Sequence, residues 1–341
     1  MKVHLNTLFV STDGTYLAKE GEAVVVRKGD ETALRVPVHL LQSVVCIGQV
    51  GMSQHLMGLC AERGVSVSFH RPSGRLVARV LGFTPGNVLL RKAQFRASED
   101  AAASLDLARV FVTAKIVNCR VLLLRAARDH GDPEGRIRAA GEGLRSVLKR
   151  IRGAETLDAL RGLEGEAART YFGVFPCLIR TEESGLAFLG RSRRPPRDAP
   201  NALLSFAYAM LATDVRSACE SVGLDSQVGF LHADRSGRPA LALDLMEELR
   251  PVVADRVVLS MLNRRQIRAS DFDQDLGGAV RITEGARKRF LAEFQNRKKE
   301  ELDHPFLGEK VTLGAVPFLQ ARLLAKALRG ELDGYPPFLW R

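Results

Sequence analysis

The pattern of apolar residues changes at Thr84-Pro85-Gly86, and this change constrains the fold more than any other feature of the 341-residue chain. Before it, short apolar or alternating runs such as residues 22–28 and 42–47 are separated by turn signals such as Gly29-Asp30, a pattern that predicts β-strands. After it, apolar residues recur at helical spacing, and the longest such stretch covers residues 98–130. We therefore predict an α+β chain, with a small β-rich domain over residues 1–84 and a larger all-α domain over residues 85–341.

Capping and turn residues place the individual elements. Ser53 is a capping residue for a helix over residues 54–62, which Gly64 ends. Asp132-Pro133 predicts another helix start, because aspartate caps a first turn and proline fits the first helical position. Further strands are predicted over residues 33–38, 65–69 and 76–83, and further helices over residues 156–175, 201–222, 241–264, 284–302 and 316–328.

Charge and composition narrow the class of partner. The chain carries 50 Lys and Arg against 39 Asp and Glu, and this formal charge of +11 favours a polyanion such as nucleic acid. Aromatic residues make up only 6%, so we expect salt-sensitive binding to a phosphate backbone rather than broad base stacking. The sequence has no apolar run of bilayer length and no signal-peptide pattern, so we expect a cytoplasmic protein with no membrane partner. The five cysteines are widely spaced, and we expect no cysteine-based zinc site.

Two carboxylates lie in an apolar segment that is typical of a buried helix. Asp244 and Glu247 are three residues apart, so on a helix they share a face, offset by about 4.5 Å along the axis. Burying two neighbouring carboxylates is costly, and a divalent cation would relieve both the desolvation and the repulsion. His232 ends an apolar run twelve residues earlier, where a histidine by itself is more often structural. The carboxylates suit Mg²⁺ or Mn²⁺, and an imidazole is more acceptable to Mn²⁺.

Two further segments have open interpretations. Glu164 and Glu166 flank Gly165 in a predicted helix, and from their spacing alone we would interpret them as ordinary exposed acids. Residues 181–200 lack periodicity and contain Gly190-Arg191-Ser192-Arg193-Arg194-Pro195-Pro196-Arg197. This basic loop is either a solvated surface loop or a loop that contacts phosphate, and the sequence leaves both interpretations open.

These segments match motifs of a known family in their order and spacing. Together they closely resemble the CRISPR-associated spacer integrase, the first of the two universal CRISPR adaptation proteins. The helical part of the resemblance is carried by Glu164-Gly165, Ala167-Ala168, Tyr171-Phe172, Arg193-Arg194-Pro195-Pro196, Asn201-Ala202-Leu203-Leu204-Ser205-Phe206, Tyr208, Gly229-Phe230-Leu231-His232 and Leu243-Asp244-Leu245-Met246-Glu247-Glu248-Leu249-Arg250-Pro251. The β-rich part is carried by Pro37, Leu40, residues 44–48, Ser53 and Gly64-Val65-Ser66-Val67, and the closing Tyr335-Pro336-Pro337-Phe338-Leu339-Trp340-Arg341 resembles the I-C branch.

The resemblance implies a catalytic set. Glu164, His232 and Glu247 match the residues with which the family binds its metal ion, Mg²⁺ or Mn²⁺. Asp244 matches an accompanying catalytic acid, which either joins the ion or acts from behind a ligand. The last metal-binding acid is aspartate in some relatives and glutamate in others, so Glu247 stays within the family's pattern.

The resemblance also implies residues near the DNA and residues without a catalytic role. Glu166 and Glu248 receive no such role, and we expect Glu248 to be structural. The residues for which we expect DNA contact are Arg191, Arg193, Arg194, Arg197 and Asn201.

The implied reaction joins the 3′-hydroxyl of a DNA fragment to a phosphodiester of a CRISPR repeat. The implied partners are double-stranded DNA, a second copy of the chain bound through the β-rich domain, and the small second adaptation protein that bridges two such dimers. Two alternatives remain open at this point. A metal-dependent DNA repair nuclease without integration would use the same residues, and a basic scaffold could bind DNA without catalysis.

Overall fold

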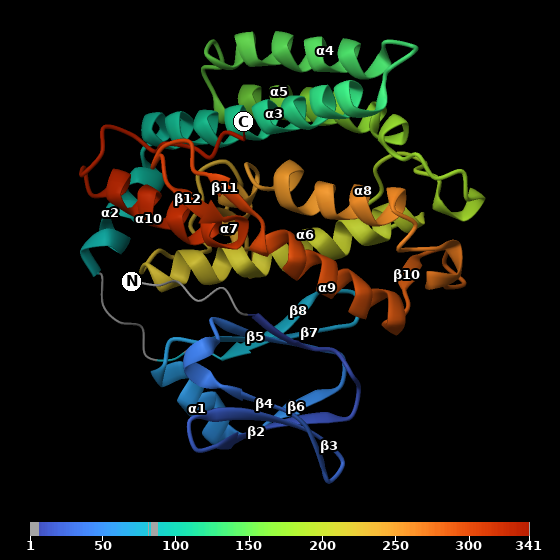
Figure 1. Cartoon of the computed structure of the whole chain (residues 1–341). Coiled ribbons are helices and arrows are strands. Elements are labelled where there is room, and N and C mark those ends of the chain that lie inside the picture. Colours follow the sequence, from blue (N-terminus) through green and yellow to red (C-terminus); the bar gives the residue numbers. More distant parts are fainter. Residues whose placement is uncertain (1–6, 81, 83–87, 341) are drawn as a thin grey trace.

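The computed structural model describes residues 7–80, 82 and 88–340, so the predicted boundary at Thr84-Pro85-Gly86 lies outside the described residues. A β-rich N-terminal part, blue in Figure 1, is followed by a larger and mostly helical part, teal to red. The predicted fold class is therefore confirmed. In the described part of the chain, no helix is long and apolar enough to cross a membrane.

The β-rich part consists of two four-stranded sheets. In the sheet β1-β5-β7-β8, the first two pairings are parallel and the last is antiparallel, whereas the other sheet has the order β4-β3-β2-β6. The side chains of Leu17, Val24, Val44 and Val67 are fully buried, so both sheets contribute to one core. The bounds are β1 (Thr7–Val10), β2 (Thr15–Glu20), β3 (Ala23–Lys28), β4 (Glu31–Pro37), β5 (Ser43–Ile47), β6 (Val50–Met52), β7 (Ser66–His70) and β8 (Leu76–Val80), with one helix, α1 (Gln54–Glu62).

The helical part is built around two long helices. The 30-residue α3 packs against α4 and α5, and α6 crosses below them toward the β-rich part (Figure 1). The bounds are α2 (Val88–Glu99), α3 (Ala101–His130), α4 (Arg136–Ile151), α5 (Leu157–Gly173), α6 (Ala199–Ser221), α7 (Ala240–Met246), α8 (Arg256–Asn263), α9 (Glu284–Lys299) and α10 (Val316–Leu328), with short strands β9 (Phe272–Gln274), β10 (Val280–Ile282), β11 (Glu301–Asp303) and β12 (Lys310–Thr312).

Polar contacts join the sheet β1-β5-β7-β8 to α6. The hydroxyls of Ser66 and Ser217 are 2.9 Å apart, and Arg79 on β8 makes a double hydrogen-bonded ion pair with Glu220 near the end of α6. Gly74, in the β7–β8 turn, lies so close to α6 that a Cβ atom there would be 2.8 Å from the ring of Phe206. The two parts therefore meet along α6.

Several elements agree with the sequence predictions. Ser53 caps α1 through a hydrogen bond from the Leu56 N–H, and α1 has the predicted bounds of residues 54–62. Thr156 and Thr283 cap α5 and α9 in the same way. These helices were predictable because a capping side chain acts within four residues of its own position.

Other predictions were wrong, each for a local reason. Residues 241–264 do not form one helix: α7 ends at Met246, a π-helical turn spans Arg250–Asp255, and α8 follows. Pro251 has no N–H to donate and its ring crowds the preceding turn, which interrupts a regular helix. The start predicted at Asp132-Pro133 is wrong in position, since α4 begins at Arg136, but the Asp132 carboxylate does accept hydrogen bonds from the Ile137 and Arg138 N–H groups in its first turn. The domain predicted to be all-α contains the hairpins β9–β10 and β11–β12, whose three-residue strands are too short to show a period.

Candidate active site

Asp244 organises the segment that presents His232. Its buried carboxylate accepts backbone N–H hydrogen bonds from Phe230 (2.6 Å), Leu231 (3.0 Å) and His232 (3.0 Å), and its Oδ1 lies 2.6 Å from His232 Nδ1. A Cβ atom on Gly229 would come within 2.8 Å of Asp244 Oδ2, so only glycine allows this close wrap. The segment is a loop rather than a strand. Since all of these contacts are internal, Asp244 acts as the residue that positions His232.

Glu247 lies on the other side of the same imidazole. Its Oε1 is 3.9 Å from His232 Nε2 and 3.1 Å from a guanidinium nitrogen of Arg250, and its side chain is 3% exposed. Its Oε2 lies 2.8 Å from Lys115 Nζ but has no hydrogen bond of good geometry. With Nδ1 of His232 bound to Asp244, Nε2 is the ring nitrogen that faces Glu247.

Lys115 links the two carboxylates that the sequence analysis assigned to different helices. It lies on α3, its ammonium pairs with both Glu164 on α5 and Glu247 after α7, and the residue is 7% exposed. Burial alone would raise the pKa of Glu247, but the charges of Arg250 and Lys115 outweigh it and lower that pKa to about 2. Burial would lower the pKa of Lys115, but Glu247 and Glu164 outweigh it and raise that pKa. The site is thus a cluster of paired acidic and basic groups in which Lys115 and Glu247 are buried.

The donor set fits a hard divalent cation in its chemistry. Lys115 pairs with both Glu164 and Glu247, and His232 Nε2 lies 3.9 Å from Glu247 Oε1. Two carboxylates with one imidazole suit Mn²⁺ and, through the oxygens, Mg²⁺. As the described residues stand, no three His, Cys, Asp or Glu side chains form a group that could hold a metal ion. The ammonium of Lys115 instead balances the two carboxylates, and Glu247 Oε2 remains without a well-formed hydrogen bond.

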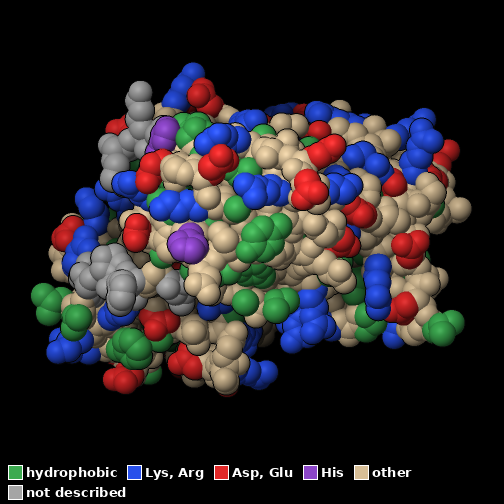
Figure 2. All heavy atoms as spheres, turned by 90° about the horizontal axis from the view of Figure 1, so that it is seen from below, with side chains coloured by type: hydrophobic (Ala, Val, Ile, Leu, Met, Phe, Trp, Pro, Cys, Tyr) green, Lys and Arg blue, Asp and Glu red, His purple; other side chains and the backbone are tan. Residues whose placement is uncertain are grey.

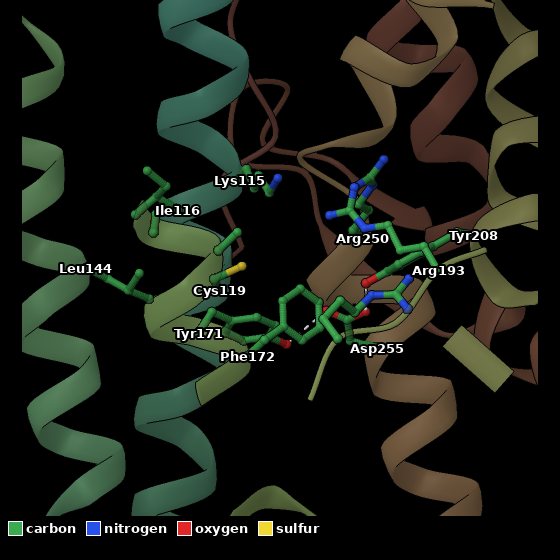
Figure 3. Close-up of a pocket in the computed structure, with 13 residues that line it drawn as sticks. Lys115, Ile116, Cys119, Leu144, Tyr171, Phe172, Arg193, Tyr208, Arg250 and Asp255 are labelled. Atoms are coloured by element: carbon green, nitrogen blue, oxygen red, sulfur yellow. Dashed lines mark hydrogen bonds between the residues drawn. The ribbon is translucent and has the colours of Figure 1, made fainter. Parts of the chain in front are cut away.

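A narrow cavity adjoins this cluster (Figure 3). Lys115 and Arg250 enter it from opposite walls, and Asp255 lies at its other end, where it accepts hydrogen bonds from Tyr171 (2.8 Å) and Tyr208 (2.7 Å). Burial raises the pKa of Asp255 to about 6. The polar groups on the cavity wall extend the charged cluster beyond the predicted residues.

Comparison with known proteins identifies the family. The family model described as CRISPR associated protein Cas1 matches residues 8–296. A protein from Rhodospirillum rubrum, named CRISPR-associated endonuclease Cas1 2, is 52% identical over the full length of both chains. The chain belongs to the Cas1 family. The resemblance inferred from the motifs is confirmed, while the likeness to the I-C branch stays a prediction.

Solved structures agree with the Cas1 fold. A casposase bound to integration product superposes with a TM-score of 0.84 at 22% identity, over 96% of this chain and 91% of that one. A Cas6-RT-Cas1–Cas2 complex superposes with a TM-score of 0.82 at 24% identity, over 100% of this chain and 36% of that longer one. At these identities the likeness concerns the fold alone.

The five residues predicted to contact DNA fall into an inward-facing group and an exposed group. Asn201 is fully buried; its amide donates to Gly190 and Asp198, and its oxygen accepts from the Ser192 N–H and from Arg191. This gives Asn201 a role in holding the loop, in place of the predicted DNA contact. Arg191 is likewise turned inward, into the cavity near Phe172 and Tyr208. The exposed members are Arg193, Arg194 and Arg197.

Two of the exposed arginines, Arg193 and Arg194, border a groove between the two parts of the Cas1 fold. Arg193 lines both this groove and the cavity beside Lys115, so the two spaces adjoin. Arg287 is 7% exposed at the groove wall, and its Nε and one Nη have no hydrogen-bond partner. Two acids, Asp273 and Glu284, also line the groove. Its basic residues are Arg71, Arg75, Arg193, Arg194, Arg281 and Arg287.

Basic side chains are also widespread outside the groove. On the face shown in Figure 2, Lys and Arg side chains alternate with acidic ones and do not gather into a single patch. Arg150, in a basic run of α4, pairs with Glu166, which agrees with our interpretation of Glu166 as an ordinary exposed acid. The groove is therefore the better candidate for a defined polyanion contact.

Glu248, next to the predicted ligand Glu247, is structural as predicted. Its carboxylate accepts from the Tyr335 hydroxyl (2.6 Å), the Phe338 N–H (2.8 Å) and the Gln320 amide (3.1 Å). Burial raises the pKa of Glu248 to about 7 despite these hydrogen bonds. Through these hydrogen bonds, Glu248 holds the C-terminal segment that contains Tyr335 and Phe338.

Sequence reasoning missed Lys115, Arg250 and Asp255. One signal was available for Lys115: it lies four residues from both Phe111 and Cys119, on a helix face that is otherwise apolar. A lysine in that position rarely stays buried without a carboxylate partner. For Asp255 no comparable signal exists, because its partners come from α5 and α6.

Proposed function

We propose that the chain is a metal-dependent DNA integrase of CRISPR adaptation. The 3′-hydroxyl of a DNA fragment would attack a phosphodiester of a CRISPR repeat. A new phosphorus–oxygen bond forms as the old one breaks, and the repeat strand leaves with a free 3′-hydroxyl. Water in place of the fragment's hydroxyl gives hydrolysis, the endonuclease activity after which the relatives are named.

One observation carries the proposal: Glu164 and Glu247 share a single cationic partner, the buried ammonium of Lys115, and His232 Nε2 lies 3.9 Å from Glu247. Phosphoryl transfer needs concentrated positive charge near the reacting phosphate, and two carboxylates are the means by which a protein holds a divalent cation there. The proposed ligands are Glu164, His232 and Glu247, with Mg²⁺ or Mn²⁺ as the ion. When bound, such an ion neutralises charge on the scissile phosphate and lowers the pKa of a coordinated hydroxyl.

The protein's own residues prepare this site. Asp244 accepts the Nδ1–H of His232, which leaves the lone pair of Nε2 on the side of the ring that faces Glu247. Arg250 lies 3.1 Å from Glu247 and lines the cavity, where its fixed positive charge can also attract a phosphate. The chain needs no covalent nucleophile, because the attacking oxygen belongs to the DNA.

The groove supplies a path for the DNA in this proposal. Arg193 and Arg194 would contact the phosphate backbone next to the active site, and Arg287 would contact it farther along. The casposase that shares the fold was solved with an integration product, and another neighbour is a Cas1–Cas2 complex. We therefore propose as partners double-stranded DNA, a second copy of the chain and the small second adaptation protein, acting in the cytoplasm.

The test is a strand-transfer assay with a labelled fragment, a repeat target and Mn²⁺. Joined product should form, and it should disappear with EDTA or with a fragment that ends in a 3′-dideoxynucleotide. Glu164→Ala, His232→Ala and Glu247→Ala should each abolish joining while DNA affinity stays within about twofold. The matched control is Glu166→Ala, on the same helix as Glu164 but exposed and paired with Arg150, which should keep full activity.

Two outcomes would favour the alternatives. Cleavage of the target without joining would indicate a repair nuclease. DNA binding that is unaffected by Mn²⁺, with no joining and no cleavage by the wild-type chain, would indicate a non-catalytic scaffold.

A further inference from the structure

Lys115 is an internal cation at the place where the proposed function requires a metal ion. Its ammonium pairs with Glu164 and, at 2.8 Å, with Glu247 Oε2. The lysine side chain is 9% exposed and the Glu247 side chain 3% exposed, so these charges have few water molecules to solvate them. In such surroundings each carboxylate needs a cationic partner, and the ammonium provides it for both.

The ammonium and a divalent cation would compete for the same oxygens. A metal ion that coordinates Glu164 and Glu247 has to replace the attraction that Lys115 now provides. Arg250 already lies 3.1 Å from the other Glu247 oxygen, so a metal ion added without displacing the ammonium would bring three cationic groups around two carboxylates. Lys115 also lines the cavity beside the cluster (Figure 3).

We propose that Lys115 is a displaceable counter-ion of the active site. It holds Glu164 and Glu247 together in the metal-free protein and weakens metal binding by competing for them. This inference rests on the proposed function, in which those carboxylates are metal ligands. Lys115 is thus a positioning residue that sets the metal affinity of the site. Because its ammonium balances the two carboxylates, the folded chain does not need a metal ion to keep them together.

The experiment compares the wild-type chain with Lys115→Met, which keeps the length and apolar stem of the side chain but removes its charge. The melting temperature in EDTA should fall, because the buried carboxylate of Glu247 and the half-buried carboxylate of Glu164 lose their shared partner. The dissociation constant for Mn²⁺, measured by isothermal titration calorimetry, should decrease at least tenfold. Mn²⁺ should also raise the melting temperature of Lys115→Met more than that of the wild type, since tighter binding to the folded state stabilises it more.

A second buried lysine provides the control. Lys298 Nζ lies 2.8 Å from Asp214 and also bonds Thr7, away from the predicted ligands. Lys298→Met should lower the melting temperature as well, but Mn²⁺ affinity should stay at the wild-type value. Should Lys115→Met fail to fold, Lys115→Arg keeps the charge and should bind Mn²⁺ no more tightly than the wild type.

The outcomes separate the two claims. Mn²⁺ binding to Lys115→Met that is equal to or weaker than binding to the wild type would overturn the counter-ion role while leaving the metal site standing. Tighter Mn²⁺ binding by Lys115→Arg would overturn it as well. If neither the wild type nor Lys115→Met bound Mn²⁺ at millimolar concentration, the metal dependence in the proposed function would fail.

Discussion

Replacing Asp244 by asparagine should damage both the stability and the chemistry of the protein. The carboxylate accepts three backbone N–H bonds and one bond from the ring of His232, all on a side chain with no exposed surface. Asparagine has only one oxygen, so at least one buried N–H loses its acceptor, at a cost of about 1–3 kcal/mol. The remaining bonds lose their charge assistance, at about 1 kcal/mol each. With two backbone bonds remaining, we expect Asp244→Asn to lower the free energy of unfolding by about 3–5 kcal/mol.

The same substitution should reverse the tautomer of His232. The new amide nitrogen would donate to Nδ1, so the proton of a neutral imidazole would move to Nε2, which faces Glu247. A protonated Nε2 cannot act as a ligand. Strand transfer should therefore be lost, and Mn²⁺ affinity should fall by about 10- to 100-fold.

Urea unfolding followed by circular dichroism measures the first effect, and calorimetric titration with Mn²⁺ measures the second. Asp234→Asn is the matched control, because Asp234 is exposed and lies two residues after His232. It should change the free energy of unfolding by less than about 0.5 kcal/mol. If Asp244→Asn also stayed within that range, the positioning role derived for Asp244 would be refuted.

Five further substitutions probe other parts of the structure. Burial raises the pKa of Asp255 from 3.8 to about 6, so between these pH values the folded state keeps a proton that the unfolded chain has released. The free energy of unfolding should therefore fall by roughly 3 kcal/mol as the pH rises from about 4 to 6. Urea unfolding of Asp255→Asn should lack this fall. In DNA-binding titrations, Arg193→Ala and Arg194→Ala should each reduce the slope of log affinity against log salt by about 1. Asn201→Ala should leave that slope unchanged but lower the free energy of unfolding by about 1–3 kcal/mol. Gly74→Ala should cost about 1–3 kcal/mol in urea unfolding, because φ is +81° and the added Cβ would clash with α6; a neutral result would contradict the close packing of the two parts.

The sequence was sufficient for features that depend on neighbouring residues. The capped helix after Ser53 and the order of β-rich and helical parts follow from capping chemistry and from the period of the apolar residues. The family could be inferred because its motifs lie in a fixed order along the chain, and the comparison confirmed it. The spacing of Asp244 and Glu247 indicated cation chemistry before any geometry was available, whereas Glu164 and His232 joined that set only through the family resemblance.

Only the tertiary structure assigned the partners of those residues. Spacing left open whether Asp244 coordinates an ion, whereas the structure commits its carboxylate to the backbone of residues 230–232 and to His232 Nδ1. Lys115 pairs with Glu247, which lies 132 residues later in the sequence. Asn201 is buried because its side chain hydrogen-bonds to the preceding loop. The physical reason is that capping and periodicity act over a few residues, whereas the neighbours of a buried charge are set by how distant helices pack.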